Sequence, residues 1–101
     1  MPRFILAFRG GMPKSPEEGQ KMMKDWNVWM DRLGPALVDK GAGFGKSRFL
    51  TKPDREDKAG DPLSGYSIVE AADIGAALGL ARKNPIFSLG GTIEVAECLQ
   101  M

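Results

Sequence analysis

Apolar and polar positions alternate along several stretches of this chain and follow a helical period in two others. Residues 3–9, RFILAFR, are typical of a strand that is apolar on both sides, with Phe4, Leu6 and Phe8 pointing one way. Further extended segments are expected, in chain order, at residues 36–39 with a continuation at 46–51, at 66–71, and at 86–99 around the pair Gly90-Gly91. The glycine pair predicts a bulge or a close approach of the backbone to a neighbour.

The first helical pattern follows residue 15. Ser15 is a suitable N-cap and Pro16 suits the first helical position, while the pair Gly34-Pro35 ends the pattern. At about 100° per residue, six apolar side chains fall within an arc of about 120°. They are Met22, Met23, Trp26, Trp29, Met30 and Leu33. This pattern predicts an amphipathic helix of about five turns that lies on a sheet.

A second, shorter helix is expected after Asp73, which is a suitable N-cap. Its apolar face would hold Ile74, Ala77, Leu78 and Ala81. The helix should end before Pro85, because the residue that precedes a proline disfavours the helical conformation.

The resulting order, strand–helix–strand–strand–helix–strand, predicts an α+β fold. With right-handed crossovers, βαββαβ gives a ferredoxin-like arrangement, an antiparallel four-stranded sheet with both helices on one face. The other face would then be open and apolar, and soluble monomers rarely expose a large apolar patch. We therefore expect two copies to stack sheet to sheet as a homodimer. The alternative is that the charged loop described below, or the C-terminal tail, folds over this face.

The most polar segment is KPDREDKAGDPLSG, residues 52–65, which contains two prolines and two glycines. It has little to bury, so we expect a surface loop, with its charges concentrated at residues 52–61. At 101 residues, the chain is expected to form one domain over residues 1–101.

Composition narrows the possible functions. Lys and Arg number 14 against 13 Asp and Glu, without a basic cluster, so a nucleic-acid partner is not expected. The apolar run between Arg3 and Arg9 has five residues, too few for a signal peptide or a membrane span. A single cysteine, Cys98, favours a reducing, cytoplasmic setting. With no histidine, histidine-dependent nucleophilic catalysis and a structural zinc site are excluded within the chain, and neither a metal nor a cofactor is expected.

The segment GAGFGKS, residues 41–47, superficially has the composition of a phosphate-binding loop. That motif requires a glycine five residues before Gly45, and Lys40 occupies the position. The following residues, SRFLTKPD, also lack the pattern of a helix, which such a loop needs at its end. We interpret the segment as a bend between two extended stretches.

Three stretches of the chain resemble the YCII-related family. They are PEEGQKMMKDWNVWMDRLGPALVDKGAGFG, GDPLSGYSIVEAADIGAALGLARKNPIF and LGGTIEVAECLQM. The resemblance is greatest to the branch with a tryptophan-bearing first helix, and it covers nearly the whole chain apart from the loop at 52–61. It implies a ferredoxin-like protomer that pairs into a dimeric α/β barrel, in agreement with the pattern of elements.

The chain departs from that family at two positions of a proposed catalytic pair. The family's pair is a histidine on the first helix and an aspartate just before a proline after the second helix. Here there is no histidine, and the second position matches Asn84, which precedes Pro85. An amide can hydrogen-bond but cannot act as a general base. Any reaction that depends on the pair should therefore be lost.

A ligand cleft is expected between the first helix and the sheet. Trp26, Trp29 and Met30 would provide an adaptable apolar lining, with one tryptophan packed in the core and the other at the edge of the cleft. The polar candidates are Ser47, Arg48, Tyr66, Ser67 and Asn84. An arginine such as Arg48 can hold a carboxylate, although strand arginines are more often solvated.

Three classes of function fit this pattern. The first is a non-catalytic or weakly catalytic dimer that binds a small molecule. The second is a cofactor-independent enzyme of the dimeric α/β-barrel kind acting on a small apolar or aromatic compound, in which the pocket works by positioning. The third is a structural protein that docks a partner through the loop at 52–61. The residues alone leave open whether any reaction is catalysed.

Overall fold

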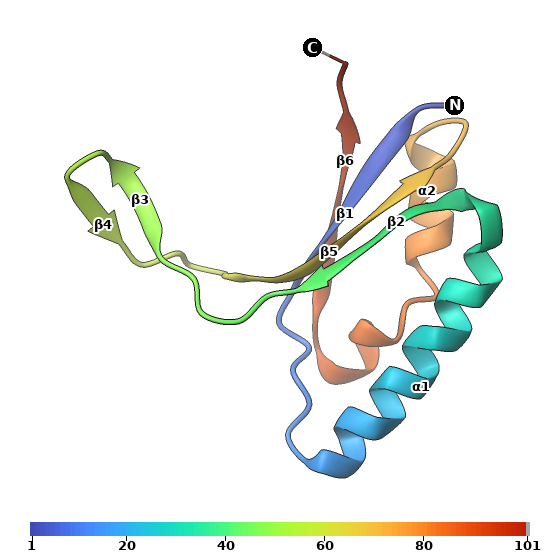
Figure 1. Cartoon of the computed structure of the whole chain (residues 1–101), viewed down its shortest axis with the longest axis horizontal. Coiled ribbons are helices and arrows are strands. Elements are labelled where there is room, and N and C mark those ends of the chain that lie inside the picture. Colours follow the sequence, from blue (N-terminus) through green and yellow to red (C-terminus); the bar gives the residue numbers. More distant parts are fainter. Residues whose placement is uncertain (101) are drawn as a thin grey trace.

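Two helices and a four-stranded antiparallel sheet form the body of the chain in a computed structural model that describes residues 1–100 (Figure 1). The α+β class expected from the sequence is confirmed. The elements are, in chain order, β1 (Arg3–Arg9), α1 (Pro16–Leu33), the 3₁₀ helix η1 (Gly34–Ala36), β2 (Leu37–Gly43), β3 (Phe49–Lys52), β4 (Arg55–Asp57), β5 (Leu63–Glu70), α2 (Ile74–Ala81), the 3₁₀ helix η2 (Pro85–Leu89) and β6 (Thr92–Cys98).

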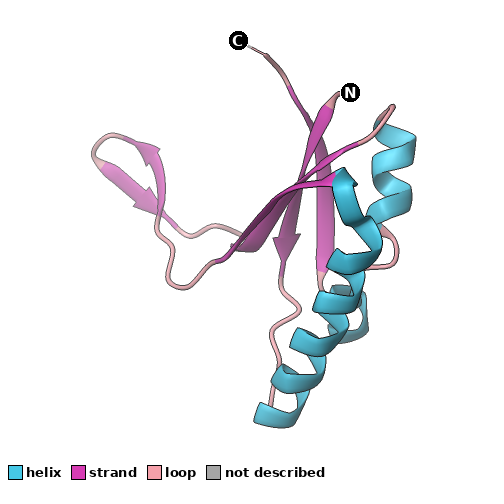
Figure 2. Cartoon of the chain, turned by 45° about the vertical axis from the view of Figure 1, so that its right-hand side comes forward, coloured by secondary structure: helices cyan, strands magenta, loops and turns pink. Residues whose placement is uncertain are grey.

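The strand order in the main sheet is β2-β5-β1-β6, and each neighbouring pair is antiparallel. Both helices lie on the same side of this sheet (Figure 2). The core forms between them, where Phe4, Leu6 and Phe8 of β1 meet Trp29 of α1 and Ala77 of α2. Burial of this one side of β1 stabilises the sandwich of sheet and helices.

The opposite side of the sheet, here called the open face, is covered by no other element in residues 1–100. Ile5 lies between Ile68 of β5 and Ala96 of β6, and Ala7 pairs with Tyr66. These side chains form a narrow apolar strip. Ile93 and Val95 do not belong to it, because they pack against the core on the helix side.

Helix α1 begins and ends where local sequence predicts. The Ser15 side chain accepts a hydrogen bond from the backbone N–H of Glu18 at 3.1 Å, and Gly34 with a φ of 53° ends the helix. Trp29 and Leu33 are buried. The expected buried face is wrong at Met23, which lies at the margin of the apolar arc and is 67% exposed.

Helix α2 is capped by Asp73 as expected, since its side chain accepts from the backbone N–H of Ala76 at 2.8 Å. Its buried face differs from the expected one. Ala77 and Ala81 are buried, whereas Ile74 is 50% and Leu78 38% exposed. The helix thus turns its small residues inward, which allows it to lie close to the sheet.

One expected strand segment has a different conformation. IFSL, residues 86–89, belongs to η2 rather than to the last strand, because the Asn84 side chain caps its start and Gly90, with a φ of 77°, ends it. Close approach at the glycine pair is confirmed at Gly91, where a Cβ would lie 2.4 Å from Cγ1 of Ile86. The bend expected at 40–45 is an irregularity within and just after β2, where the register with β5 shifts around Gly41.

The segment interpreted as a loop at 52–61 is partly a β-hairpin. Strands β3 and β4 pair with one another and project from the body on the side away from the helices (Figure 1). Every residue from Phe49 to Asp57 is exposed, so the expected surface location is confirmed while the expected lack of structure is wrong. No helix begins directly after Lys46, in agreement with the rejection of a phosphate-binding loop.

The chain exposes more surface than a compact protein of its mass. Its accessible area is 7308 Å², whereas about 5,600 Å² is typical for a monomer of this size. The radius of gyration is 14.6 Å, against about 12.7 Å for a compact domain of equal length. The projecting hairpin accounts for part of this excess. Among residues 1–100, neither helix is long and apolar enough to cross a membrane.

Candidate functional site

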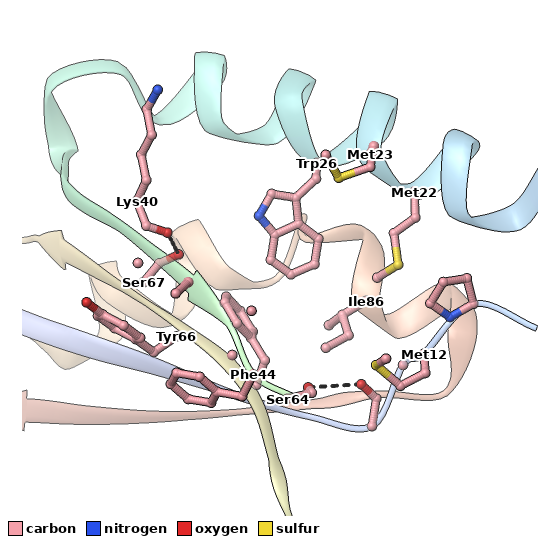
Figure 3. Close-up of a pocket in the computed structure, with 18 of the residues that line it drawn as sticks. Met12, Met22, Met23, Trp26, Lys40, Phe44, Ser64, Tyr66, Ser67 and Ile86 are labelled. Carbon is pink, nitrogen blue, oxygen red and sulfur yellow. Dashed lines mark hydrogen bonds between the residues drawn. The ribbon is translucent and has the colours of Figure 1, made fainter. Parts of the chain in front are cut away.

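A cavity of about 660 Å³ lies between α1 and one end of the sheet (Figure 3). Its walls come from α1, from the loop after β1, from the ends of β2 and β5, and from Ile86 of η2. A volume of this size is within the range of small-molecule sites, which is about 300–1,000 Å³.

Helix α1 provides an apolar wall of sulfur-containing and aromatic side chains. Met22, Met23, Trp26 and Met30 line the cavity, and Met12 faces them from the loop after β1. Flexible thioethers adapt to irregular ligands, and an indole ring offers a flat apolar surface. This lining suits a small ligand with an apolar or aromatic body.

Glycines leave the sheet side of the cavity without bulky side chains. Gly41 has a φ of 75°, and a Cβ there would lie 1.7 Å from the carbonyl oxygen of Tyr66. At Gly65, a Cβ would lie 2.9 Å from the carbonyl oxygen of Ala42. The strands therefore approach too closely for a side chain at either position, and no side chain from Gly41 or Gly65 projects into the cavity.

Turn geometry fixes the loop that closes the cavity next to β1. Gly10 and Gly11 have φ values of 67° and 69°, which glycine adopts without the steric penalty of other residues. At Gly11, a Cβ would lie 2.3 Å from Cγ1 of Ile86. Ile86, 2% exposed, thus fits between this loop and Gly91 and forms the bottom of the apolar wall.

Few polar side chains line the cavity, and two of them bond to the protein. Ser67 donates to the carbonyl oxygen of Lys40 at 2.9 Å, and Ser64 donates to that of Gly10 at 3.0 Å (Figure 3). The Trp26 indole N–H has no hydrogen-bond partner within residues 1–100, and Lys40 is exposed without a salt bridge there. These two groups can donate to a ligand that carries a hydrogen-bond acceptor.

Tyr66 is one of the lining residues, but its side chain lies on the open face of the sheet beside Ala7, and its hydroxyl is already used. It donates to Oδ2 of Asp39 at 3.0 Å, and its ring stacks on Phe44 with 5.9 Å between ring centres. The hydrogen bond and the negative charge of Asp39 raise the pKa of Tyr66 above its ordinary value of 10.0. Tyr66 therefore stays protonated at neutral pH and is a poor base.

The two tryptophans have different surroundings in the structure. Trp29 is 3% exposed and its indole N–H donates to the carbonyl oxygen of Leu80 at 3.0 Å, so it belongs to the core. Trp26 is half-buried and meets the rings of Phe8 and Trp29 edge-on, with ring centres 4.9 and 5.7 Å away. Of the expected cleft residues, Trp26, Met30, Tyr66 and Ser67 line the cavity.

The other polar candidates lie elsewhere. Ser47 and Arg48 are exposed on the segment before β3, where Arg48 pairs with Glu56 at 2.7 Å. Asn84 is 3% exposed and its Oδ1 accepts from the backbone N–H of Ile86 at 2.8 Å. Its Nδ2 is buried without a partner among residues 1–100. Asn84 thus caps η2 and does not line the cavity.

Several lining residues were not expected from the sequence. They include the loop residues 10–13, Lys40, Phe44 and Ile86. The glycines at 10–11, 41–45 and 90–91 were a signal of close backbone approach. The sequence alone did not show that these places border a cavity. Among the lining residues, Lys40 and Tyr66 are the ones with titratable side chains.

No family model matches this chain, and no curated protein matches it either.

Proposed function

We propose that the protein binds a small apolar or aromatic molecule in the cavity between α1 and the sheet, and that it is non-catalytic or only weakly catalytic. The cavity carries this proposal. Its volume suits a small ligand, and its lining of methionines with Trp26 matches an apolar body. The N–H of Trp26, which has no partner among residues 1–100, and the amine of Lys40 would recognise a hydrogen-bond acceptor on that ligand.

The chemistry of the lining favours binding over catalysis. A general base must reach the proton it removes and have a pKa suited to neutral pH. Tyr66, with its raised pKa and its bond to Asp39, does not meet this condition.

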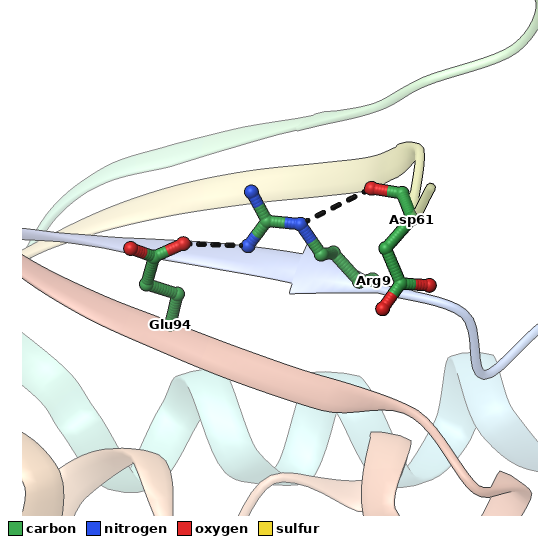
Figure 4. A network of polar contacts seen from close by, with 3 residues as sticks. All are labelled: Arg9, Asp61 and Glu94. Carbon is green, nitrogen blue, oxygen red and sulfur yellow. Dashed lines mark hydrogen bonds and ion pairs between the residues drawn. The ribbon is translucent and has the colours of Figure 1, made fainter. Parts of the chain in front are cut away.

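We further propose a ferredoxin-like protomer that pairs through the open face into a dimeric α/β barrel, as the YCII-related family would imply. The observed strand order and the two helices on one side support this arrangement. The open face also presents charges of both signs, since Arg9 pairs with Glu94 at 2.7 Å on this side of the sheet (Figure 4). Such a surface can meet a rotated copy of itself without like-charge conflict.

A cavity-filling variant tests the binding proposal. Gly43 pairs with Gly65, which in turn pairs with Phe8, so a side chain on Gly43 would lie on the helix side of the sheet. A Cβ on Gly43 would meet only the carbonyl oxygen of Ser64, at 3.9 Å. Gly43→Leu therefore places a side chain in the cavity with little strain. Gly79→Leu is the matched control, because Gly79 is exposed on α2 with open space around it.

The measurement is a thermal-shift screen of neutral aromatics and aromatic carboxylates, followed by calorimetric titration of the compounds that bind. We expect compounds that bind the wild type and Gly79→Leu to bind Gly43→Leu about tenfold more weakly or not at all, because the side chain occupies their volume. Equal affinity for the three proteins would show that the ligand binds elsewhere. A screen without any binding compound would contradict the proposal.

A further inference from the structure

The hairpin β3–β4 projects from the body without packing against it. We call residues 48–57 the arm. All of its residues are exposed, and it extends from the ends of β2 and β5 on the side of the open face (Figures 1 and 2). A two-stranded hairpin on its own is marginally stable in water, so an arm of this kind gains most of its stability from a surface that it contacts.

The arm presents one large apolar side chain on each of its two faces. Phe49 pairs with Asp57 and is 49% exposed, while Leu50 pairs with Glu56 and is 62% exposed. The pairs Arg48–Glu56 and Arg55–Asp57 lie beside them, but exposed ion pairs contribute little stability. The two apolar residues are therefore the ones that a docking surface would cover.

The base of the arm is fixed on the open face. Arg9 donates to the carbonyl oxygen of Asp61 at 3.2 Å while its other nitrogen pairs with Glu94 of β6 (Figure 4). Ser64 also donates to the carbonyl oxygen of Gly10 at 3.0 Å. These bonds tie residues 61 and 64, which follow the arm, to the end of β1 and to Gly10. The arm and the open face therefore border one common space (Figure 1).

The accessible area that the chain exposes beyond that of a compact monomer is large enough for the interface of a stable dimer. The chain exposes about 1,700 Å² more than a compact monomer of its mass. A standard interface buries about 800 Å² on each partner, and obligate homodimers bury more. The narrow strip on the open face and the arm together would provide such an area.

Charge balance favours a second copy as the occupant of that space. The arm holds three basic and three acidic side chains, namely Arg48, Lys52, Arg55, Asp54, Glu56 and Asp57. The open face likewise carries the pairs Arg3–Glu70 and Arg9–Glu94. A surface with both signs in equal number can be complementary to a rotated copy of itself, whereas it offers a strongly charged partner no net attraction.

We propose that the arm docks on a second copy of this chain, so that each protomer of the dimer is held by the arm of the other. The inference rests on the proposed dimer and goes beyond it, because sheet-to-sheet stacking alone does not require the arm. In a two-fold arrangement, a partner that stacks on the open face enters the space beside the arm, and Phe49 and Leu50 are then buried against it.

Analytical ultracentrifugation of a double variant tests the role of the arm. Phe49→Ser with Leu50→Ser should weaken the dimer about tenfold or more, since it removes two apolar side chains from the interface. The control is Val28→Ser with Ile74→Ser, two apolar residues that are 46% and 50% exposed on the helices. The control should leave the dimer dissociation constant unchanged, with circular dichroism verifying that both variants fold.

The outcomes separate the arm from the dimer itself. An unchanged dissociation constant for the arm variant would overturn the role of the arm and leave the sheet-to-sheet dimer standing. A wild type that stays at the mass of one chain at all concentrations would overturn both. Either result is independent of the ligand titration, which concerns the cavity.

A photo-crosslinking experiment identifies what the arm contacts. With benzoylphenylalanine in place of Phe49, we expect a covalent product with the mass of two chains, and with the same residue in place of Val28 we expect none. Crosslinks only within one chain would show that the arm folds back on its own body, which would overturn the proposal.

Discussion

Trp26 and Trp29 lie three residues apart on α1, and at the scale of single residues their surroundings differ. The Trp29 ring is 3% exposed and its N–H is bonded to Leu80, whereas Trp26 borders the cavity. The helical period placed both rings on the inner side of α1. It could not tell them apart, because burial of each ring depends on residues brought in from β1 and α2.

Substitution of each tryptophan by alanine should reveal this difference. Trp29→Ala should lower the free energy of unfolding by about 3–5 kcal/mol, since it removes a fully packed ring and leaves the carbonyl oxygen of Leu80 without its donor. Trp26→Ala should cost less, because part of its ring faces the cavity. Urea unfolding measures both values. A larger loss for Trp26→Ala than for Trp29→Ala would contradict the assignment.

The bond between Tyr66 and Asp39 predicts a pH effect. Tyr66 is the single tyrosine of the chain, so the absorbance of tyrosinate reports its titration directly. Because the folded pKa is raised, the contribution of this bond to stability is present below pH 10 and is lost as the pH rises through the folded pKa. In Asp39→Asn, which lacks the charge but keeps an acceptor, the titration midpoint should fall. Equal midpoints would show that Asp39 does not act on Tyr66.

Asn84 shows a second limit of reading single residues. Its place before Pro85 suggested a polar group at the cleft, yet the side chain caps η2 and its Nδ2 is buried without a partner among residues 1–100. Capping is a local property that the sequence Asn-Pro favours, but the direction of the side chain depends on the tertiary packing around it. Position along the chain was therefore a poor guide to location at the site.

At the scale of elements, local chemistry was the reliable guide. Helix α1 begins after Ser15 and ends at Gly34, and α2 begins after Asp73, as expected, because capping depends on residues within one turn. The segment 86–89 was wrong as a strand, since an apolar run of four has no period that separates a strand from a 3₁₀ helix. Residues 46–51 were expected to be extended, and β3 overlaps them, but its pairing with β4 was missed because the apolar residues are few and the charges resemble those of a loop.

Removal of this hairpin tests its independence from the body. If residues 49–57 are replaced by a short glycine–serine link, the protomer should still unfold cooperatively, with a stability within about 1 kcal/mol of the wild-type protomer. The segment contacts no core residue, and closure of a loop depends only weakly on its length. The measurement is urea unfolding at a concentration where both proteins are monomeric. Loss of a cooperative transition would show that the arm supports the core.

At the scale of the whole molecule, the sheet has a helix-covered side and an open side, and the alternation along β1 indicated both. Phe4, Leu6 and Phe8 occur in the core as the pattern required. The open face is less apolar than expected, because Ile93 and Val95 pack toward the helices and ion pairs flank Ile5 and Ile68. An interface on this side would combine a narrow apolar strip with charged ends.

Ile68→Lys tests whether that strip joins two copies. Ile68 pairs with Ile5 in the strip, so a lysine there would place an unpaired charge inside a stacked interface. Light scattering should show the wild type at the mass of two chains and Ile68→Lys at the mass of one. The matched control, Ile74→Lys on exposed α2, should remain at two.

The unfolding free energy of the isolated Ile68→Lys protomer decides how that result is read. Ile68 is only half-buried in the single chain, so the protomer should stay folded and the loss should concern association alone. If Ile68→Lys still forms the same dimer as the wild type, the copies must pair through another surface. The two-sided apolar pattern of β1 would then have to be explained within a single chain, where no other element among residues 1–100 covers Ile5 and Ala7.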